Sequence, residues 1–280
     1  MANNWPVMLW MQFSPLGRGL LLLWLLTMLS LPALIRTWGE RIRTYVIIAS
    51  VLLQAATIIT ILLPVWGATT TLRSVALVLV LGWLAEFVGS KTGIPFGRYH
   101  YTQRLQPQLG GVPLLIPVAW LMMLAPAWAV GAAITGSGRG MGFVVASALA
   151  FTAWDLFLDP QMVAWGLWVW PRSEVRASPP APDRAAERRP GLLHRARTRG
   201  FFGIPWSNYA GWLVVSALIT WIAVPAAALP TPAGTPLITI YGLVWVLETV
   251  GQLVFWHLTG PGLTGGVVMG SCLLWALLKG

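Results

Sequence analysis

Four long stretches of this chain contain no Asp, Glu, Lys or Arg, and they constrain its fold more than any other feature. These stretches are residues 44–72, 105–138, 200–247 and 249–278. A helix needs about 20 predominantly apolar residues to cross a bilayer, so the longest stretch has room for nearly two crossings. The apolar runs are continuous and lack the alternation that is typical of barrel strands. The sequence therefore predicts an all-α, polytopic bundle of transmembrane helices.

Eight membrane spans are predicted from these apolar runs. They lie near residues 17–35, 45–66, 72–88, 113–134, 141–158, 207–229, 236–258 and 262–278. Several Gly and Pro residues interrupt the start of the last span, so a bundle of seven spans is the alternative. The first span lacks a small-x-small cleavage site at a suitable distance, and we expect it to be retained rather than removed as a signal peptide. We expect residues 1–280 to form a single transmembrane domain.

The basic residues are distributed unevenly between the two ends of the predicted helices. If successive spans alternate in direction, 14 of the 18 Lys and Arg residues fall on one side. The positive-inside rule makes that side cytoplasmic, which predicts a multi-pass protein of the inner (cytoplasmic) membrane. Eight of the Arg residues lie in segment 171–199, which has no periodic apolar face, so we expect a flexible cytoplasmic loop. No stacking aromatics stand among these Arg residues, which argues against binding to nucleic acid.

Half of the chain's eight carboxylates lie in or at the edge of the apolar segments: Glu86, Asp155, Asp159 and Glu248. An acid in hydrocarbon is costly unless it faces the bundle interior, so such acids mark functional sites. Asp155 and Asp159 are four residues apart and share one helix face. Two acids this close cannot both ionise cheaply in a dry site, so we expect one to hold a transferable proton. Alternatively, the pair caps a helix that ends or kinks at Pro160, or it binds an Arg from a loop.

The two glutamates have different surroundings. Glu86 is near the cytoplasmic end of its span, where a salt bridge to Lys91 or Arg98 is the alternative to a catalytic role. Glu248 lies deeper and has no basic residue in its own segment, so it needs a partner from another helix. Of the two, Glu248 is the stronger catalytic candidate.

Two loops on the predicted cytoplasmic side, 89–113 and 200–212, combine Gly and Pro with aromatic residues and could form an ordered lid. Their candidate binding residues are Tyr99, Tyr101, Trp206 and Asn208. The aromatic rings could line a cavity and stabilise a cation, or they belong to the aromatic belt of the membrane interface. The Asn side chain could orient a water, although capping a helix is its simpler role. Both loops contain Gly-Ile-Pro, a likeness too short to establish a repeat.

The residue types that are scarce narrow the chemistry further. The three His residues are too few for the His clusters of membrane di-iron enzymes, and the single Cys272 cannot form a cysteine-based metal site. No predicted span contains a Lys for a retinal Schiff base, and no dinucleotide-binding fingerprint is present. We therefore expect neither a metal nor a cofactor. Acid–base chemistry on an apolar substrate suits the residues that the chain does have.

A set of motifs spans residues 82–212, the middle half of the chain. They are Glu86-Phe-Val-Gly, Thr92-Gly-Ile-Pro-Phe-Gly-Arg-Tyr-His-Tyr101, Gly111-Val-Pro with Pro117 and Trp120, Asp155-Leu-Phe-Leu-Asp159-Pro160, Trp168-Val-Trp170 and Phe202-Gly-Ile-Pro-Trp-Ser-Asn-Tyr-Ala-Gly-Trp212. In combination, these motifs resemble those of the membrane carotenoid-biosynthesis family of carotenoid hydratases, of the bisanhydrobacterioruberin hydratase and γ-carotene hydratase type. The Arg-rich segment 171–199 is longer than expected for that family, and the first 70 residues match only in hydropathy.

The resemblance implies a lyase (a hydro-lyase) that adds water to the terminal C=C bond of an acyclic carotenoid end group, giving a tertiary alcohol. The implied partners are an acyclic or monocyclic carotenoid, water and the lipid bilayer. A carboxyl, with Asp159 favoured, would protonate the alkene, and aromatic rings, including that of Trp120, would bind the substrate. Glu86, Glu248 or Asn208 would orient the water. The alternatives are a non-enzymatic carotenoid-binding subunit and a small proton-coupled transporter; a prenyl transferase would need Asp-rich magnesium motifs.

Overall fold

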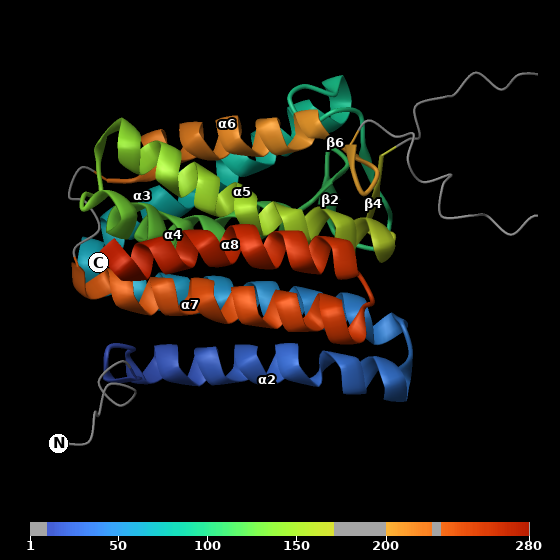
Figure 1. The fold of residues 1–280 in the computed structure, drawn as a ribbon, viewed down its shortest axis with the longest axis horizontal. Helices are drawn as coiled ribbons and strands as arrows, with labels where there is room; N and C mark the ends of the chain where they lie inside the picture. The colour runs from blue at the N-terminus through green and yellow to red at the C-terminus, as the bar shows by residue number, and fades with distance from the viewer. Residues whose placement is uncertain (1–9, 171–199, 226–230, 280) are drawn as a thin grey trace, which may run out of the picture.

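The computed structural model describes residues 10–170, 200–225 and 231–279, which form a bundle of lengthwise-packed helices (Figure 1). The helices are α2 (Pro15–Trp38), α3 (Arg41–Thr92), α4 (Leu115–Thr135), α5 (Gly140–Ala164), α6 (Trp206–Ala223), α7 (Thr231–Val250) and α8 (Thr259–Lys279), and a π-helical turn, η2 (Gly251–Phe255), follows α7. Six of the described helices are long and apolar enough to cross a membrane. The all-α, multi-pass fold class is therefore confirmed. The predicted loop 171–199 lies outside the described residues.

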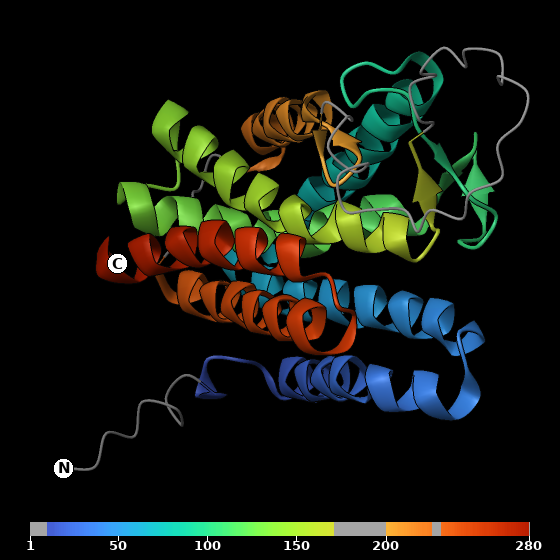
Figure 2. The same ribbon diagram turned by 45° about the vertical axis from the view of Figure 1, so that its right-hand side comes forward.

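Helix α3 contains two of the predicted spans, joined by a sharp reversal. Its 52 residues are interrupted at Gly67, whose φ of 73° is outside the helical region. Thr71 Oγ1 donates a hydrogen bond to the carbonyl of Leu62 at 3.3 Å, although nine residues of straight helix would separate them by about 13 Å. The two halves of α3 consequently run in opposite directions, as the colour gradient shows in Figures 1 and 2.

Two predicted helix ends need correction, and each lies next to a proline. The helix that was predicted to end or kink at Pro160 continues to Ala164. Proline is tolerated here because α5 runs on for only one more turn, which ends with Trp165 N donating to Gln161 O at 2.9 Å. Helix α6 ends at Ala223, before the predicted end at 229. Pro225 forces the residue before it out of the helical conformation.

One end of the bundle, on the right in Figure 1, gathers most of the connections and is called the loop end here. It holds the α2–α3 turn, residues 93–114 and the segments that flank 171–199. Three two-stranded antiparallel sheets form there: β1 (His100–Tyr101) with β4 (Trp168–Val169), β2 (Gln108–Leu109) with β3 (Val112–Pro113), and β5 (Gly200–Phe201) with β6 (Ile204–Pro205). The described basic residues assigned to the crowded side belong to these helix ends and loops: Arg36, Arg41, Arg43, Lys91, Arg98 and Arg104.

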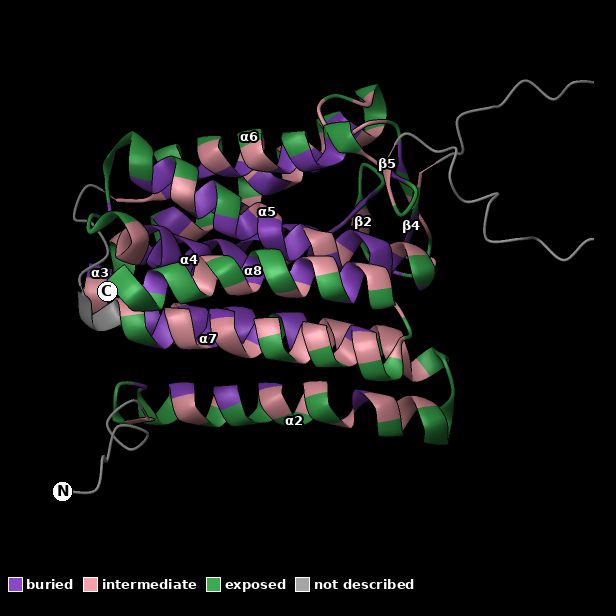
Figure 3. Ribbon diagram, in the orientation of Figure 1, coloured by how far each residue is buried: buried purple, intermediate pink, exposed green. Residues whose placement is uncertain are grey.

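Burial follows the position of each helix in the bundle (Figure 3). Helix α4 is buried along most of its length, with 78% of its apolar window inside the protein. Helix α2 lies at the edge, and only 17% of its window is buried. Its outward face carries Leu22, Leu26 and Leu29. A helix with an apolar outer face suits contact with lipid rather than water.

Candidate active site

A cavity of about 310 Å³ brings together side chains from six helices and the loop end. Seven of the nine candidate residues line it: Glu86, Tyr99, Tyr101, Trp120, Asp159, Asn208 and Glu248. Asp155 lies directly behind Asp159. The remaining lining is mainly apolar and aromatic. Small-molecule sites typically measure about 300–1,000 Å³ and have this character, with a few polar groups that fix orientation.

Asn208 joins the two aspartates. Its Nδ2 donates to Asp155 Oδ2 at 3.0 Å and also to Asp159 Oδ2, which one amide can do because it carries two hydrogens. Trp168 Nε1 donates to Asp159 Oδ1 at 3.1 Å. Two carboxyl groups that share one amide in a buried site cannot both ionise cheaply, so we expect one of them to hold a proton.

These contacts decide between the interpretations of the pair and of Asn208. Both aspartates are buried within the length of α5, and no described Arg pairs with either. Pro205 occupies the N-cap position of α6 without a side-chain cap, so Asn208 is not the cap. Asp155 Oδ1 has no hydrogen-bond partner among the described residues. The pair is thus a buried centre in which Asp159 faces the cavity.

Glu86 is held by three hydrogen-bond donors. Tyr99 Oη and Tyr101 Oη both donate to its Oε2, the latter at 2.8 Å, and Trp120 Nε1 donates to its Oε1 at 2.9 Å. The alternative salt bridge to Lys91 or Arg98 is not formed. An acid surrounded only by donors is arranged as a carboxylate. Burial, followed by the charge of Glu86, raises the pKa of each tyrosine well above its ordinary value, so both phenols remain donors.

Glu248 lines the cavity from α7, beside a group of buried amides that charge-based reasoning missed. Gln252, on η2, donates from Nε2 to Phe157 O at 2.9 Å and to Gln161 Oε1 at 2.7 Å. Gln252 follows Glu248 by four residues, and π-helical turns such as η2 are frequent at functional sites. Gln54, on α3, also lines the cavity. The sequence did contain a signal for these amides. A Gln within an apolar stretch is costly to bury unless its polar groups form hydrogen bonds.

The aromatic residues that line the cavity are not all the predicted ones. Trp206 does not line the cavity; its side chain is 60% exposed at the start of α6. Trp212 of the same helix lines the cavity and stacks on Trp120 with ring centroids 4.9 Å apart. Tyr99 stacks on Trp170 at 5.4 Å. The cavity is thus walled by π faces next to its acids.

Comparison with known proteins gives a family and one relative. Residues 45–272 match the family described as carotenoid biosynthesis protein. The chain is 31% identical over 132 residues to a bisanhydrobacterioruberin hydratase from Haloarcula japonica, covering 46% of this chain and 36% of that protein. No solved structure matches. The described residues contain no group of three or more His, Cys, Asp or Glu arranged to hold a metal ion.

Proposed function

The chain belongs to the carotenoid biosynthesis protein family, and on this basis we propose that it is a carotenoid hydratase. The reaction is the addition of water to the terminal C=C bond of an acyclic end group, which yields a tertiary alcohol. The observation that carries the proposal is the arrangement of two acidic centres around one apolar cavity. One centre is the buried Asp155–Asp159 pair, which we expect to share one proton, and the other, Glu86, is surrounded by donors. The name of the Haloarcula japonica relative supports the same reaction class.

Proton transfer to the alkene starts the reaction. Asp159 faces the cavity and gives its proton to the inner, CH carbon of the terminal C=C bond, as a positioned general acid. The π electrons of the double bond form the new C–H bond, and a cation remains on the tertiary carbon. The rings of Tyr99 and Trp212 shelter this cation by their π faces, and the carboxylate of Glu86 stabilises its charge without moving.

Water capture completes the reaction. Glu248 orients a water whose oxygen forms the C–O bond with the tertiary carbon, and the buried amide of Gln161 lies near it on the cavity wall. The added water loses one proton to the Asp155–Asp159 pair, which returns to its starting state. The net change is the addition of one water. The Asp155–Asp159 pair therefore gives up one proton and regains one in each turnover.

A pigment analysis tests the proposal against the non-enzymatic alternatives. The gene is expressed in a host that makes lycopene or γ-carotene, beside an empty-vector control and Asp159→Asn. A hydratase produces a pigment heavier by one water, and the variant loses that product. Unchanged pigment that co-purifies with the protein would favour a carotenoid-binding subunit. Unchanged pigment without binding would favour the proton-coupled transporter.

A further inference from the structure

The cavity reaches the outer surface of the bundle between α2 and α7. Four exposed side chains belong to its lining: Leu29 of α2, Val246 and Val250 of α7, and Phe255 of η2, with exposures of 66%, 46%, 46% and 49%. A side chain that both lines a cavity and is exposed marks a place where the cavity opens. Both helices are candidate membrane spans, so this opening, the α2–α7 seam, faces hydrocarbon.

Helix α2 is attached to the bundle mainly through α3. Ser50 Oγ of α3 contacts Met28 Sδ at 2.9 Å, and α2 lies at the edge of the bundle in both views (Figures 1 and 2). On its inner side, the buried Trp24 and the half-buried Met28 line the cavity. The space between α2 and α7 is therefore a continuation of the cavity rather than a packed contact.

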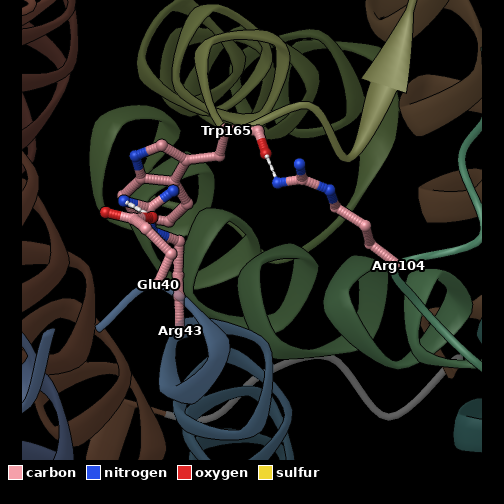
Figure 4. A network of polar contacts seen from close by, with 4 residues as sticks. All are labelled: Glu40, Arg43, Arg104 and Trp165. Atoms are coloured by element: carbon pink, nitrogen blue, oxygen red, sulfur yellow. Dashed lines mark hydrogen bonds and ion pairs between the residues drawn. The ribbon is translucent and has the colours of Figure 1, made fainter. Parts of the chain in front are cut away.

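At the loop end of the cavity, unlike at the seam, several contacts hold the lining residue Trp165 in place (Figure 4). Trp165 and Trp256 meet edge to face at 5.3 Å. The guanidinium of Arg43, paired with Glu40, lies 4.7 Å from the centre of the Trp165 ring. Arg104 Nη1 donates to Trp165 O at 2.7 Å. Among the described residues, two cations thus hold Trp165 in place, Arg43 at its ring and Arg104 at its backbone carbonyl, while the seam has no such contact.

We propose that the α2–α7 seam is where the polyene chain of the substrate enters and stays bound, an inference that rests on the proposed function. The carotenoid moves sideways from the bilayer until its end group reaches Asp159. At about 310 Å³, the cavity is at the lower end of small-molecule sites. It holds the end group and the first part of the chain. The remaining polyene extends through the seam into lipid, which solvates it without further cost.

Single-cysteine labelling tests the seam. In a Cys272→Ser background, Leu29→Cys places a thiol at the opening. Leu26→Cys is the matched control, because Leu26 lies on the same helix with 64% exposure and does not line the cavity. Each protein reacts with a bulky, lipid-soluble maleimide in detergent. We expect label at Leu29→Cys to lower kcat/KM for the full-length carotenoid at least about tenfold, and label at Leu26→Cys to leave it within about twofold.

A second substrate, a short isoprenoid alkene with the same end group, shows whether the label blocks entry of the long chain or damages the acids. Labelled Leu29→Cys should hydrate it at the unlabelled rate, because it needs no seam. Full turnover of the long carotenoid after labelling, or equal loss for both substrates, overturns the proposal. Bound pigment, measured by visible absorption, gives a second readout. If unlabelled protein binds pigment without hydrating it, the proposed function is wrong, while label-dependent loss of that pigment still supports the seam.

Discussion

At the scale of single residues, the two acidic centres differ in their hydrogen-bonding partners. Asp155 and Asp159 both bond to the amide of Asn208 in a buried site, so we expect one of them to carry a proton. Glu86 accepts from two phenols and an indole, so it is suited to remain a carboxylate. The different surroundings of the two centres allow one to donate a proton and the other to stay charged at the same pH.

Replacing either aspartate by its amide should remove the shared proton. Asp159→Asn and Asp155→Asn keep size and most hydrogen bonds, and we expect product formation to fall about 10²–10⁴-fold. The measurement is product formed by purified protein that is monodisperse and retains substrate. Asp183→Asn, an acid in segment 171–199, controls for the substitution itself. If both variants stay within about threefold of wild type, the pair is structural and the acid is Glu86 or Glu248.

Alkaline pH should destabilise the protein through the loop tyrosines. Burial, and then the charge of Glu86, raises the pKa of Tyr101. Above about pH 10 the unfolded tyrosine ionises while the folded one keeps its proton, so the free energy of unfolding falls as pH rises. In Tyr101→Phe, the thermal midpoint should be lower at neutral pH, where the bond to Glu86 is lost, but its alkaline decline should be shallower. An equally steep decline in the variant would contradict this assignment.

Sequence reasoning identified the acids and several residues near them, but not which of these bond to one another. The spacing of Asp155 and Asp159 predicts a shared face because both belong to one helix. The contact of Asn208 with that face depends on how α6 packs against α5, which no local pattern encodes. Trp212 rather than Trp206 enters the cavity for a related reason. The β5–β6 hairpin sets where α6 begins and how it is rotated, and a two-residue strand leaves no recognisable pattern in the sequence.

At the scale of elements, Phe96 connects the first Gly-Ile-Pro loop to two helices. Its ring is buried against Gly89 of α3 and Gly211 of α6. A Cβ added at Gly211 would lie 2.8 Å from Phe96 Cδ1 and 3.0 Å from Pro95 Cγ. Two glycines thus leave the space in which Phe96 packs, and this contact holds the loop that carries Tyr99 and Tyr101. The eight apolar segments were predictable from hydropathy, whereas this seating depends on contacts between segments distant in sequence.

Adding a methyl group at that contact should loosen the loop. For Gly211→Ala we expect a loss of about 1–3 kcal/mol, because the buried Phe96 must move. Gly19→Ala is the matched control, since no neighbour lies within 4 Å of its Cβ and Ala favours a helix. Thermal midpoints in detergent and protease cleavage within residues 93–114 measure the effect. Equal midpoints for the two variants would show that Phe96 does not seat the loop.

At the scale of the whole molecule, charge and chemistry gather at the same end. The cavity acids lie toward the loop end, where the described Arg and Lys of the crowded side also lie. Hydropathy and charge bias predicted this topology because each span contributes to it independently. The cavity could not be predicted in this way, because it depends on spaces left between helices. We continue to expect that the loop end is cytoplasmic.

Segment 171–199 should serve orientation rather than chemistry. It carries eight Arg residues and no periodic apolar face, a composition suited to the positive-inside rule and to anionic lipid. Replacing it by a short Gly/Ser linker with two or three Arg should leave turnover measurable in membranes. A variant that inserts normally but is wholly inactive would show that the segment takes part in catalysis.

The central claim is that one water adds across a C=C bond as a proton and a hydroxyl, and isotope labelling tests it most directly. Purified protein is incubated with its carotenoid in water enriched in deuterium and heavy oxygen, without oxygen gas or added cofactor. The account predicts a tertiary alcohol with one carbon-bound deuterium and a hydroxyl oxygen from water. The carbon label should disappear with Asp159→Asn. An alcohol whose hydroxyl lacks the heavy oxygen of the water, or one without carbon-bound deuterium, would contradict it.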